Sequence, residues 1–393
     1  MSNKVPQIRF NGYSDAWEER KLEDIFLYKQ GQQVPVENQF TKPGKHRHRF
    51  IRIVDLTTTD EEPRYIEYSG HNTISATDLF MIRYGQPGVI GYGYEGVIAN
   101  NLFKLIPKVK ANNRFFKYRL DSMYPKIQSL SSSTTMPAIS FKSLDVLDVR
   151  YPDIKEQEKI GAFFKQLDGT IALHQRKLDL LKEQKKGFLQ KMFPKNGEKV
   201  PELRFKGFTG DWEERKLKNV STFKQGIQVD LERQYQIQND HLIRFIRIVD
   251  YTQNTQDIRY IDINTSKNII QPDDIIMVRY GATAGFIGRG IEGILANNMF
   301  SINPTQKIVK DYLYIYLKQD KIYKQLNNSN GSSAMPAINF SLVGNLNITY
   351  PKLEEQQKIG SFFKQLDETI DLHQRKLDLL KEQKKGYLQK MFV

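Results

Sequence analysis

The sequence of 393 residues contains no cysteine, so it can form neither a disulfide nor a thiolate metal site. No apolar run approaches the ~18–20 residues that a membrane span needs. The N-terminal stretch MSNKVPQIRFNGY lacks the apolar centre of a signal peptide. These absences predict a cytoplasmic protein with no membrane partner. The length allows at least two domains with their own cores.

The usual motifs of catalysis are also missing. There is no G-x-x-x-x-G-K-[ST] phosphate loop, no H-E-x-x-H zinc motif and no Asn-Pro-Pro-aromatic methyltransferase signature. GYGYEG (91–96) and GRGIEG (288–293) match the dinucleotide pattern, but a strand-like run follows each one where that fold needs a helix. We therefore predict a chain without catalytic residues, metal site or bound cofactor.

What the chain does have is positive charge. With 59 basic and 45 acidic residues its net charge is +14. A charge of this sign favours a polyanionic partner, most simply nucleic acid.

The chain is also one unit written twice, with an offset that grows from 195 to 199 residues. The matching pairs include VPQIRFNGY (5–13) with VPELRFKGF (200–208), WEERKL (17–22) with WEERKL (212–217), and MPAI (136–139) with MPAI (335–338). Divergence between the copies is uneven. Residues 160–193 and 359–392 differ at only four of 34 positions, whereas 31–48 and 226–243 have little in common. The fixed and the varying parts therefore have different roles.

The fixed part has the four-three apolar spacing of a coiled-coil seam. We expect two long helices, over 152–193 and 351–393, that pack against each other antiparallel about a pseudo-twofold axis. Gly187 and Gly386 are expected to bend or end them. His174 and His373 are expected to set the register, with a metal or catalytic role as the alternative. Lys182, Lys185, Lys186 and Arg176, with their twins, are expected to face solvent, with contact to phosphate as the alternative. The predicted seam consists of Ile160, Phe164, Leu167, Ile171, His174, Leu178 and Leu181, and of Ile359, Phe363, Leu366, Ile370, His373, Leu377 and Leu380.

The varying part reads as two mixed α/β globular domains, about 20–150 and 215–349. FIRIVD (50–55 and 245–250) has the alternation of a strand, and residues 115–130 and 311–326 have helical spacing. The fold class is therefore α+β, with 1–151 and 194–350 each forming a terminal segment or linker plus a domain. Because 5–13 matches 200–208, we expect the N-terminal segment to pack beside the C-terminus and make the architecture quasi-circular.

Three segments carry a family resemblance: DDIIMVRYGATAGFIGRGIEGILANNMF (273–300), MPAINFSLVGNLNITYPKLEEQQKIGSFF (335–363) and LDLLKEQKKGYLQKMF (377–392). With their first-half counterparts they resemble the specificity subunit of type I restriction–modification enzymes. The loop RYGQPGVIG (83–91) departs by one residue from RYGATAGFIG (279–288).

The resemblance implies a non-catalytic subunit in which each domain, as a target-recognition domain, reads one half of a split double-stranded DNA site. The paired helices would set the gap between halves and dock two adenine methyltransferase subunits, to which two restriction subunits would be added. S-adenosylmethionine, ATP and Mg²⁺ would then belong to those partners.

Base-reading residues are expected where the copies differ, and phosphate or framework residues where they agree. The first group contains Lys42, Lys45, His46, Arg47, His48 and Arg49 in the first domain, and Arg233, Gln236, Gln238, Asn239 and His241 in the second. The second group contains Arg83, Tyr84, Arg279, Tyr280 and the polar runs 131–135 and 327–333. Two other interpretations stay open: a coiled-coil adaptor that binds only proteins, and a fused enzyme with unfamiliar motifs.

Overall fold

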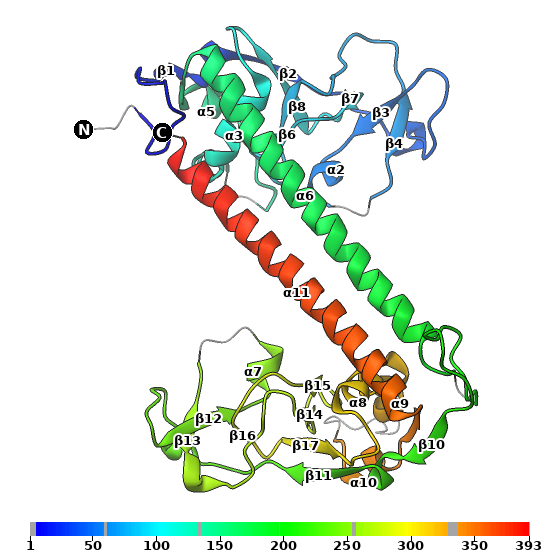
Figure 1. Ribbon diagram of the computed structural model, residues 1–393. Helices are drawn as coiled ribbons and strands as arrows, with labels where there is room; N and C mark the ends of the chain where they lie inside the picture. The colour runs from blue at the N-terminus through cyan, green and yellow to red at the C-terminus, as the bar shows by residue number, and fades with distance from the viewer. Residues whose placement is uncertain are drawn as a thin grey trace. The chain divides into compact units, whose positions relative to one another are not determined.

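A computed structural model describes residues 5–58, 61–132, 135–195, 197–253, 257–328 and 337–392. The chain forms two compact units. Unit 1 comprises Met1–Arg176 and Gln374–Val393, and unit 2 comprises Lys177–His373. Each unit therefore combines one globular domain with a part of each long helix (Figure 1).

The globular domain of unit 1 holds three small sheets. Their strand orders are β2-β8-β5-β6, β4-β3-β7 and β1-β9, and all neighbours are antiparallel except β3 and β7. The elements are β1 Glu18–Lys21, α1 Leu22–Ile25, β2 Phe26–Gln30, η1 Val36–Asn38, β3 Arg47–Ile51, α2 Val54–Thr57, β4 Arg64–Glu67, β5 Leu79–Ile82, β6 Ile90–Gly91, β7 Val97–Ile98, β8 Leu102–Pro107, α3 Asn113–Ser122, α4 Tyr124–Ser129, α5 Phe141–Asp145 and β9 Asp148–Tyr151.

The domain of unit 2 repeats this plan. Its sheets have the orders β11-β17-β14-β15, β13-β12-β16 and β10-β18. The elements are β10 Glu213–Lys216, η2 Leu217–Asn219, β11 Ser221–Gln225, η3 Leu231–Arg233, β12 Leu242–Ile246, α7 Val249–Thr252, β13 Tyr260–Asp262, η4 Ile263–Thr265, β14 Ile275–Val278, β15 Ile287–Gly288, β16 Ile294–Leu295, β17 Met299–Pro304, α8 Lys310–Leu317, α9 Asp320–Asn328, α10 Phe340–Gly344 and β18 Asn347–Tyr350.

Two local predictions need correction. FIRIVD is a strand only in its first two residues, because β3 and β12 end at Ile51 and Ile246 and a short helix begins three residues after each end. The expected helix over 115–130 is broken at Met123. Pro125 has no N–H with which to continue α3, and it lies in the first turn of α4, where none is needed.

The two long helices are confirmed as α6, Ile154–Lys191, and α11, Leu353–Lys390, with 38 residues each. The expectation that Gly187 and Gly386 could end them is wrong, because both glycines lie inside helix. A helical glycine costs about 1 kcal/mol relative to alanine. Packing of the flanking Phe188 and Leu189 on the core of unit 2 outweighs that local preference.

Within each unit the segments of α6 and α11 run antiparallel, as predicted. In unit 1, Phe163 meets Tyr387 with ring centroids 5.1 Å apart. In unit 2, Phe188 meets Phe362 at 5.0 Å. Asp168 pairs with Lys384 in unit 1 at 2.7 Å, and its twin Asp367 pairs with Lys185 in unit 2. The same contact set thus recurs in both units with the roles of the helices exchanged.

The predicted seam is the protected side of both helices. Eight seam residues are at most 8% exposed: Ile160, Phe164, Leu178 and Leu181, and their twins Ile359, Phe363, Leu377 and Leu380. The middle positions are half-buried, namely Leu167, Ile171, His174, Leu366, Ile370 and His373. His174 and His373 continue the apolar seam and are half-buried, so they are suited to set the register in which the two helices pair.

The N-terminal segment packs against the end of α11, which confirms the expected proximity of the two chain ends (Figure 1). The Ile8 N–H donates to the Lys390 carbonyl at 3.0 Å, as the Leu203 N–H donates to the Lys191 carbonyl at 2.8 Å in unit 2. Beside it, Arg9 forms a two-pronged ion pair with Glu156, at 2.8 Å for both bonds.

Arg204 forms the equivalent pair with Glu355 in unit 2. The Glu156 side chain is 0% exposed and that of Glu355 is 2% exposed. Each pair therefore ties an irregular segment to the first turn of a long helix.

Replacement of Arg9 by alanine should destabilise unit 1, because Glu156 would stay buried without its partner. We expect the free energy of unfolding to fall by about 3 kcal/mol. Trp17 lies in unit 1 and Trp212 in unit 2, so urea unfolding of a Trp212→Phe background followed by fluorescence reports unit 1. Arg20→Ala, which breaks an exposed pair with Glu18, is the control and should change little. Equal effects would contradict a structural role for the Arg9 pair.

Candidate nucleic-acid interface

Each globular domain carries one long loop at an equivalent place. Loop 1 (31–46) joins β2 to β3, and loop 2 (226–241) joins β11 to β12. Both loops begin at a glycine, because a Cβ on Gly31 would lie 2.2 Å from the Ala99 carbonyl oxygen and one on Gly226 2.1 Å from that of Ala296. The root of the loop is thus fixed in both domains while its sequence varies.

Loop 1 is basic and open to solvent. Lys42 and Lys45 are exposed, and His46 has the left-handed φ of 68° that a tight turn requires. Arg47, His48 and Arg49, which were predicted to belong to the loop, instead lie on strand β3. Arg47 stacks on the Phe40 ring at 3.5 Å from its centroid.

Loop 2 has the same course but different chemistry. Arg233 ends η3, and Gln238 and His241 are exposed further along. The Asn239 side chain accepts a hydrogen bond from the His241 backbone N–H at 3.0 Å and so shapes the tip. Ile237 occupies the position that Lys42 has in loop 1. The Ile237 residue is 83% exposed.

Arg49 makes a contact that both copies share. It pairs with Asp55 at 3.1 Å, as Arg244 pairs with Asp250 at 3.0 Å. The Asp55 and Asp250 side chains are 1% and 0% exposed. A repeated pair with a buried carboxylate favours a framework role for Arg49 over base reading.

Arg83 and Arg279 also lie in a repeated framework contact. Arg83 donates to the Ile139 carbonyl at 3.2 Å and to Gln30 Oε1 at 3.0 Å. Arg279 donates in the same way to Ile338 and Gln225, at 3.2 and 2.9 Å. These bonds connect the end of β5 or β14 to the segment that precedes α5 or α10.

Tyr84 and Tyr280 follow these arginines and remain accessible, at 37% and 38% exposure. Their backbones form bridges with Ala138 and Ala337. The two rings therefore project from equivalent backbone positions in the two domains. The polar run 327–333 falls largely outside the described residues, and the run 131–135 does so at 133–134. Within the described part, the Ser132 hydroxyl accepts a hydrogen bond from the Ala138 backbone N–H at 3.1 Å.

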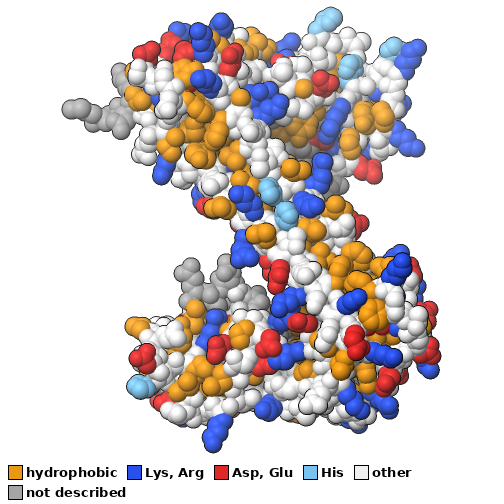
Figure 2. Space-filling view, in the orientation of Figure 1, with side chains coloured by type: hydrophobic (Ala, Val, Ile, Leu, Met, Phe, Trp, Pro, Cys, Tyr) orange, Lys and Arg blue, Asp and Glu red, His pale blue; other side chains and the backbone are white. Residues whose placement is uncertain are grey.

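Sequence reasoning overlooked exposed apolar residues in both loops. Val36 and Leu231 occupy equivalent positions in η1 and η3 and are 74% and 76% exposed. The signal was an apolar residue in the same place of two otherwise dissimilar loops. On the face shown in Figure 2, positive side chains are spread over both units with negative ones between them, so no single basic stripe marks the interface.

Among the described residues, no helix is both long and apolar enough to cross a membrane. The same part of the chain holds no group of three or more His, Asp or Glu side chains placed to bind a metal ion.

Replacement of Arg83 by alanine should act on stability first, because it removes two charged hydrogen bonds that join separate elements. We expect the free energy of unfolding of unit 1 to fall by about 2 kcal/mol, measured through Trp17 fluorescence. Tyr84→Ala, at the neighbouring exposed ring, should cost much less. A stable Arg83→Ala protein with altered DNA selectivity would instead assign Arg83 to readout.

Comparisons with known proteins agree with this architecture. Residues 14–183 and 209–382 match the family described as "Type I restriction modification DNA specificity domain". The specificity subunit of the type I enzyme EcoBI from Escherichia coli is 24% identical over 65% of this chain and 59% of its own length. The MjaVIII specificity subunit from Methanocaldococcus jannaschii is 28% identical over 34% of this chain and 32% of its own length.

A putative type I specificity subunit from Mycoplasma genitalium is 20% identical over 99% of this chain and 96% of its own length. The crystal structure of a type I restriction-modification S subunit from M. genitalium has a TM-score of 0.70 and covers 99% of both chains at 16% identity. A second solved structure comes from work on complex assembly and conformational transition of the type I R-M system. It has a TM-score of 0.52 and covers 96% of this chain and 97% of that chain.

Proposed function

The chain belongs to the type I restriction–modification DNA specificity family, and from this premise we propose that its two globular domains read the two unlike halves of one split DNA site. The observation that carries the proposal is the contrast within each domain. The contacts of Arg83 and Arg279 and the glycine roots of the loops coincide between the copies, whereas the sequences of loops 1 and 2 differ. A common frame with unlike loops is what a reader of two unlike half-sites needs.

The loops differ in the way that base edges differ. Loop 1 offers the amines of Lys42 and Lys45, and positively charged side chains pair with the N7 and O6 acceptors of guanine. Loop 2 offers the exposed Ile237 beside the amide of Gln238. An apolar side chain suits a thymine methyl, and an amide pairs with adenine N6 and N7. The exposed Tyr84 and Tyr280 are suited to phosphate contacts, which position the protein without reading sequence.

The helices supply the docking faces for partner subunits. Apolar residues lie exposed on both helices in each unit: Leu173 (66%) and Leu379 (51%) in unit 1, and Leu372 (62%) and Leu180 (47%) in unit 2. Leu173 is the twin of Leu372, and Leu180 is the twin of Leu379. Two equivalent apolar faces fit two copies of one partner, and we assign them to two methyltransferase subunits that methylate adenine N6.

In this account the chain selects the DNA and its partners perform the chemistry. S-adenosylmethionine belongs to the methyltransferase subunits, and ATP and Mg²⁺ belong to restriction subunits that join through them. We also propose that the paired long helices set the gap between the two half-sites on the duplex.

An exchange of loops tests the assignment of half-sites. Replacement of 31–48 by the equally long segment 226–243 should convert one half of the methylated motif toward the other half and leave that other half unchanged. Methylome sequencing of cells that carry the variant and its methyltransferase gives the readout. The reciprocal replacement is the matched control and should change the opposite half. A change in both halves from one exchange would refute the assignment.

The docking faces can be tested one unit at a time. Leu173→Arg with Leu379→Arg should weaken one methyltransferase contact at least tenfold, about 1.4 kcal/mol. Native mass spectrometry should then show one methyltransferase per chain where the unaltered protein binds two. Leu180→Arg with Leu372→Arg should give the same result through unit 2, and DNA binding by the isolated chain should persist. Two bound methyltransferases in both variants would place the docking surface elsewhere.

A further inference from the structure

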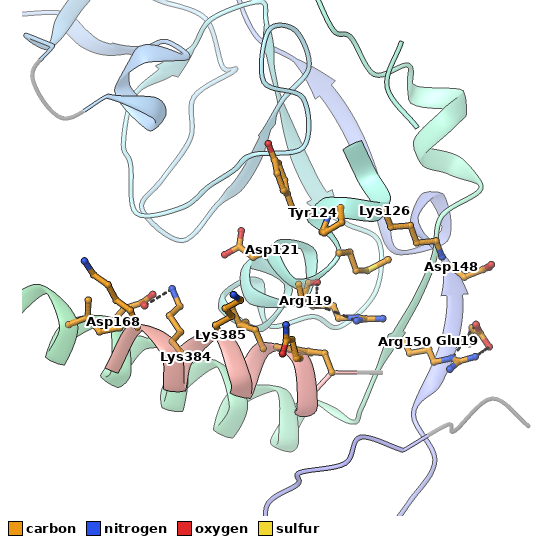
Figure 3. A pocket seen from close by; sticks show the side chains of 18 residues that line it. Glu19, Arg119, Asp121, Tyr124, Lys126, Asp148, Arg150, Asp168, Lys384 and Lys385 are labelled. Atoms are coloured by element: carbon orange, nitrogen blue, oxygen red, sulfur yellow. Dashed lines mark hydrogen bonds and ion pairs between the residues drawn. The ribbon is translucent and has the colours of Figure 1, made fainter. Parts of the chain in front are cut away.

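A groove lies at an equivalent place in each unit, between the last turns of one long helix and the helices of the globular domain. In unit 1 it measures about 940 Å³ and lies between α11 and the α3–α4 pair (Figure 3). In unit 2 it measures about 800 Å³ and lies between α6 and the α8–α9 pair. The long helices contribute identical residues, because Lys182, Lys185 and Lys186 in unit 2 match Lys381, Lys384 and Lys385 in unit 1.

The groove of unit 1 holds its own carboxylates. Lys384 on α11 points to Asp168 on α6, and the Arg150–Glu19 pair lies on adjacent strands at 3.2 Å (Figure 3). Asp121 and Asp148 add two more acidic groups to the same wall. The positive charge of this groove is therefore largely balanced from within the chain.

The groove of unit 2 is less well balanced. Lys185 pairs with Asp367 as Lys384 pairs with Asp168, but the domain wall contributes fewer carboxylates. Its one acidic lining residue is Asp320. Three of its lysines, Lys182, Lys186 and Lys324, have no carboxylate within 4.0 Å among the residues that the structure describes. The lining lysines are Lys182, Lys185 and Lys186 from α6, Lys195 after it, and Lys318, Lys321 and Lys324 from the domain.

The difference comes from substitutions on the domain side. Phe115 packs on Trp17 and Phe392 as Tyr312 packs on Trp212 and Phe193. This correspondence aligns α3 with α8, and it places Lys318 where unit 1 has Asp121. By the same offset Lys321 stands where unit 1 has Tyr124. Three lysines thus replace Asp121, Tyr124 and Ile127 opposite an unchanged lysine-rich helix, whereas Tyr316 and Tyr323 replace Arg119 and Lys126.

One of these lysines is half-buried. Lys321 donates to the Pro194 carbonyl at 2.9 Å, and partial burial lowers its pKa. An anion that reaches this ammonium group would offset the cost of its partial desolvation. Beside it, Leu189, Phe193 and Ile315 give the groove an apolar floor.

We propose that the groove of unit 2, between α6 and α8–α9, binds an acidic segment of a partner protein, and that the equivalent groove of unit 1 does not. A peptide can place aliphatic groups on Leu189, Phe193 and Ile315 while its carboxylates meet Lys182, Lys318 and Lys324. Duplex DNA fits less well, because its phosphates lie on a convex surface and have no use for an apolar floor. The groove makes the two units unequal and adds a partner contact to the proposed function without depending on it.

The test needs only the purified full-length chain and a probe peptide. A fluorescein-labelled ten-residue peptide of alternating glutamate and leucine should bind one per chain by anisotropy at low salt. Lys318→Asp with Lys324→Glu should weaken this binding at least tenfold, about 1.4 kcal/mol. Lys206→Asp with Lys352→Glu makes the same charge change on exposed residues of unit 2 outside the groove, and it should shift the affinity less than threefold, about 0.7 kcal/mol.

A glutamine version of the peptide should not bind, and random-sequence duplex DNA should not displace the acidic peptide. Circular dichroism should show that both variants keep their helix content. Absence of saturable peptide binding, equal losses in the two variants, or displacement by duplex DNA would each overturn the proposal. Motif methylation by the complex is read out separately, so failure here leaves the assignment of half-sites standing.

Discussion

The structure depends on the burial of one apolar stripe along two helices of 38 residues. A helix of this length with so narrow a stripe is not stable alone in water, because its helical propensity supplies little of the required free energy. Each fully buried Leu, Ile or Phe of the seam contributes about 1.5–3 kcal/mol relative to exposure. Within each unit the stripe of one helix meets that of the other, and Asp168–Lys384 or Asp367–Lys185 flanks the contact. This requirement explains why the helix sequence appears twice and has changed so little.

Apart from the helices, each unit consists of residues that hold the fold together and of one loop that varies between the copies. The buried pairs Arg9–Glu156 and Arg204–Glu355 attach a terminal segment to each helix start, and the Arg83 and Arg279 contacts hold the domain edges. Because these contacts determine the backbone around the loop roots, loops 1 and 2 can change without loss of fold. Separation of stability from recognition in this way lets one scaffold present two different surfaces.

Much of this arrangement was predictable from the sequence, because it follows from repeats and heptad spacing. The seam from Ile160 to Leu181, the antiparallel contacts within units and the packing of the N-terminal segment belong to this group. Other features depend on tertiary contacts that no local pattern reveals. Gly187 stays helical because its neighbours pack on a core, and Arg49 belongs to the frame because Asp55 is buried beside it. The charge imbalance between the two grooves needed the alignment of α3 with α8, since those segments share almost no sequence.

The central proposal is that one chain carries two unlike DNA readers joined by a pair of long helices. Sequencing of methylated bases in a host that expresses this chain with its methyltransferase tests it most directly. The account predicts an adenine-methylated motif made of two different short halves separated by a constant number of unspecified bases. An uninterrupted motif, or two identical halves in inverted order, would contradict it.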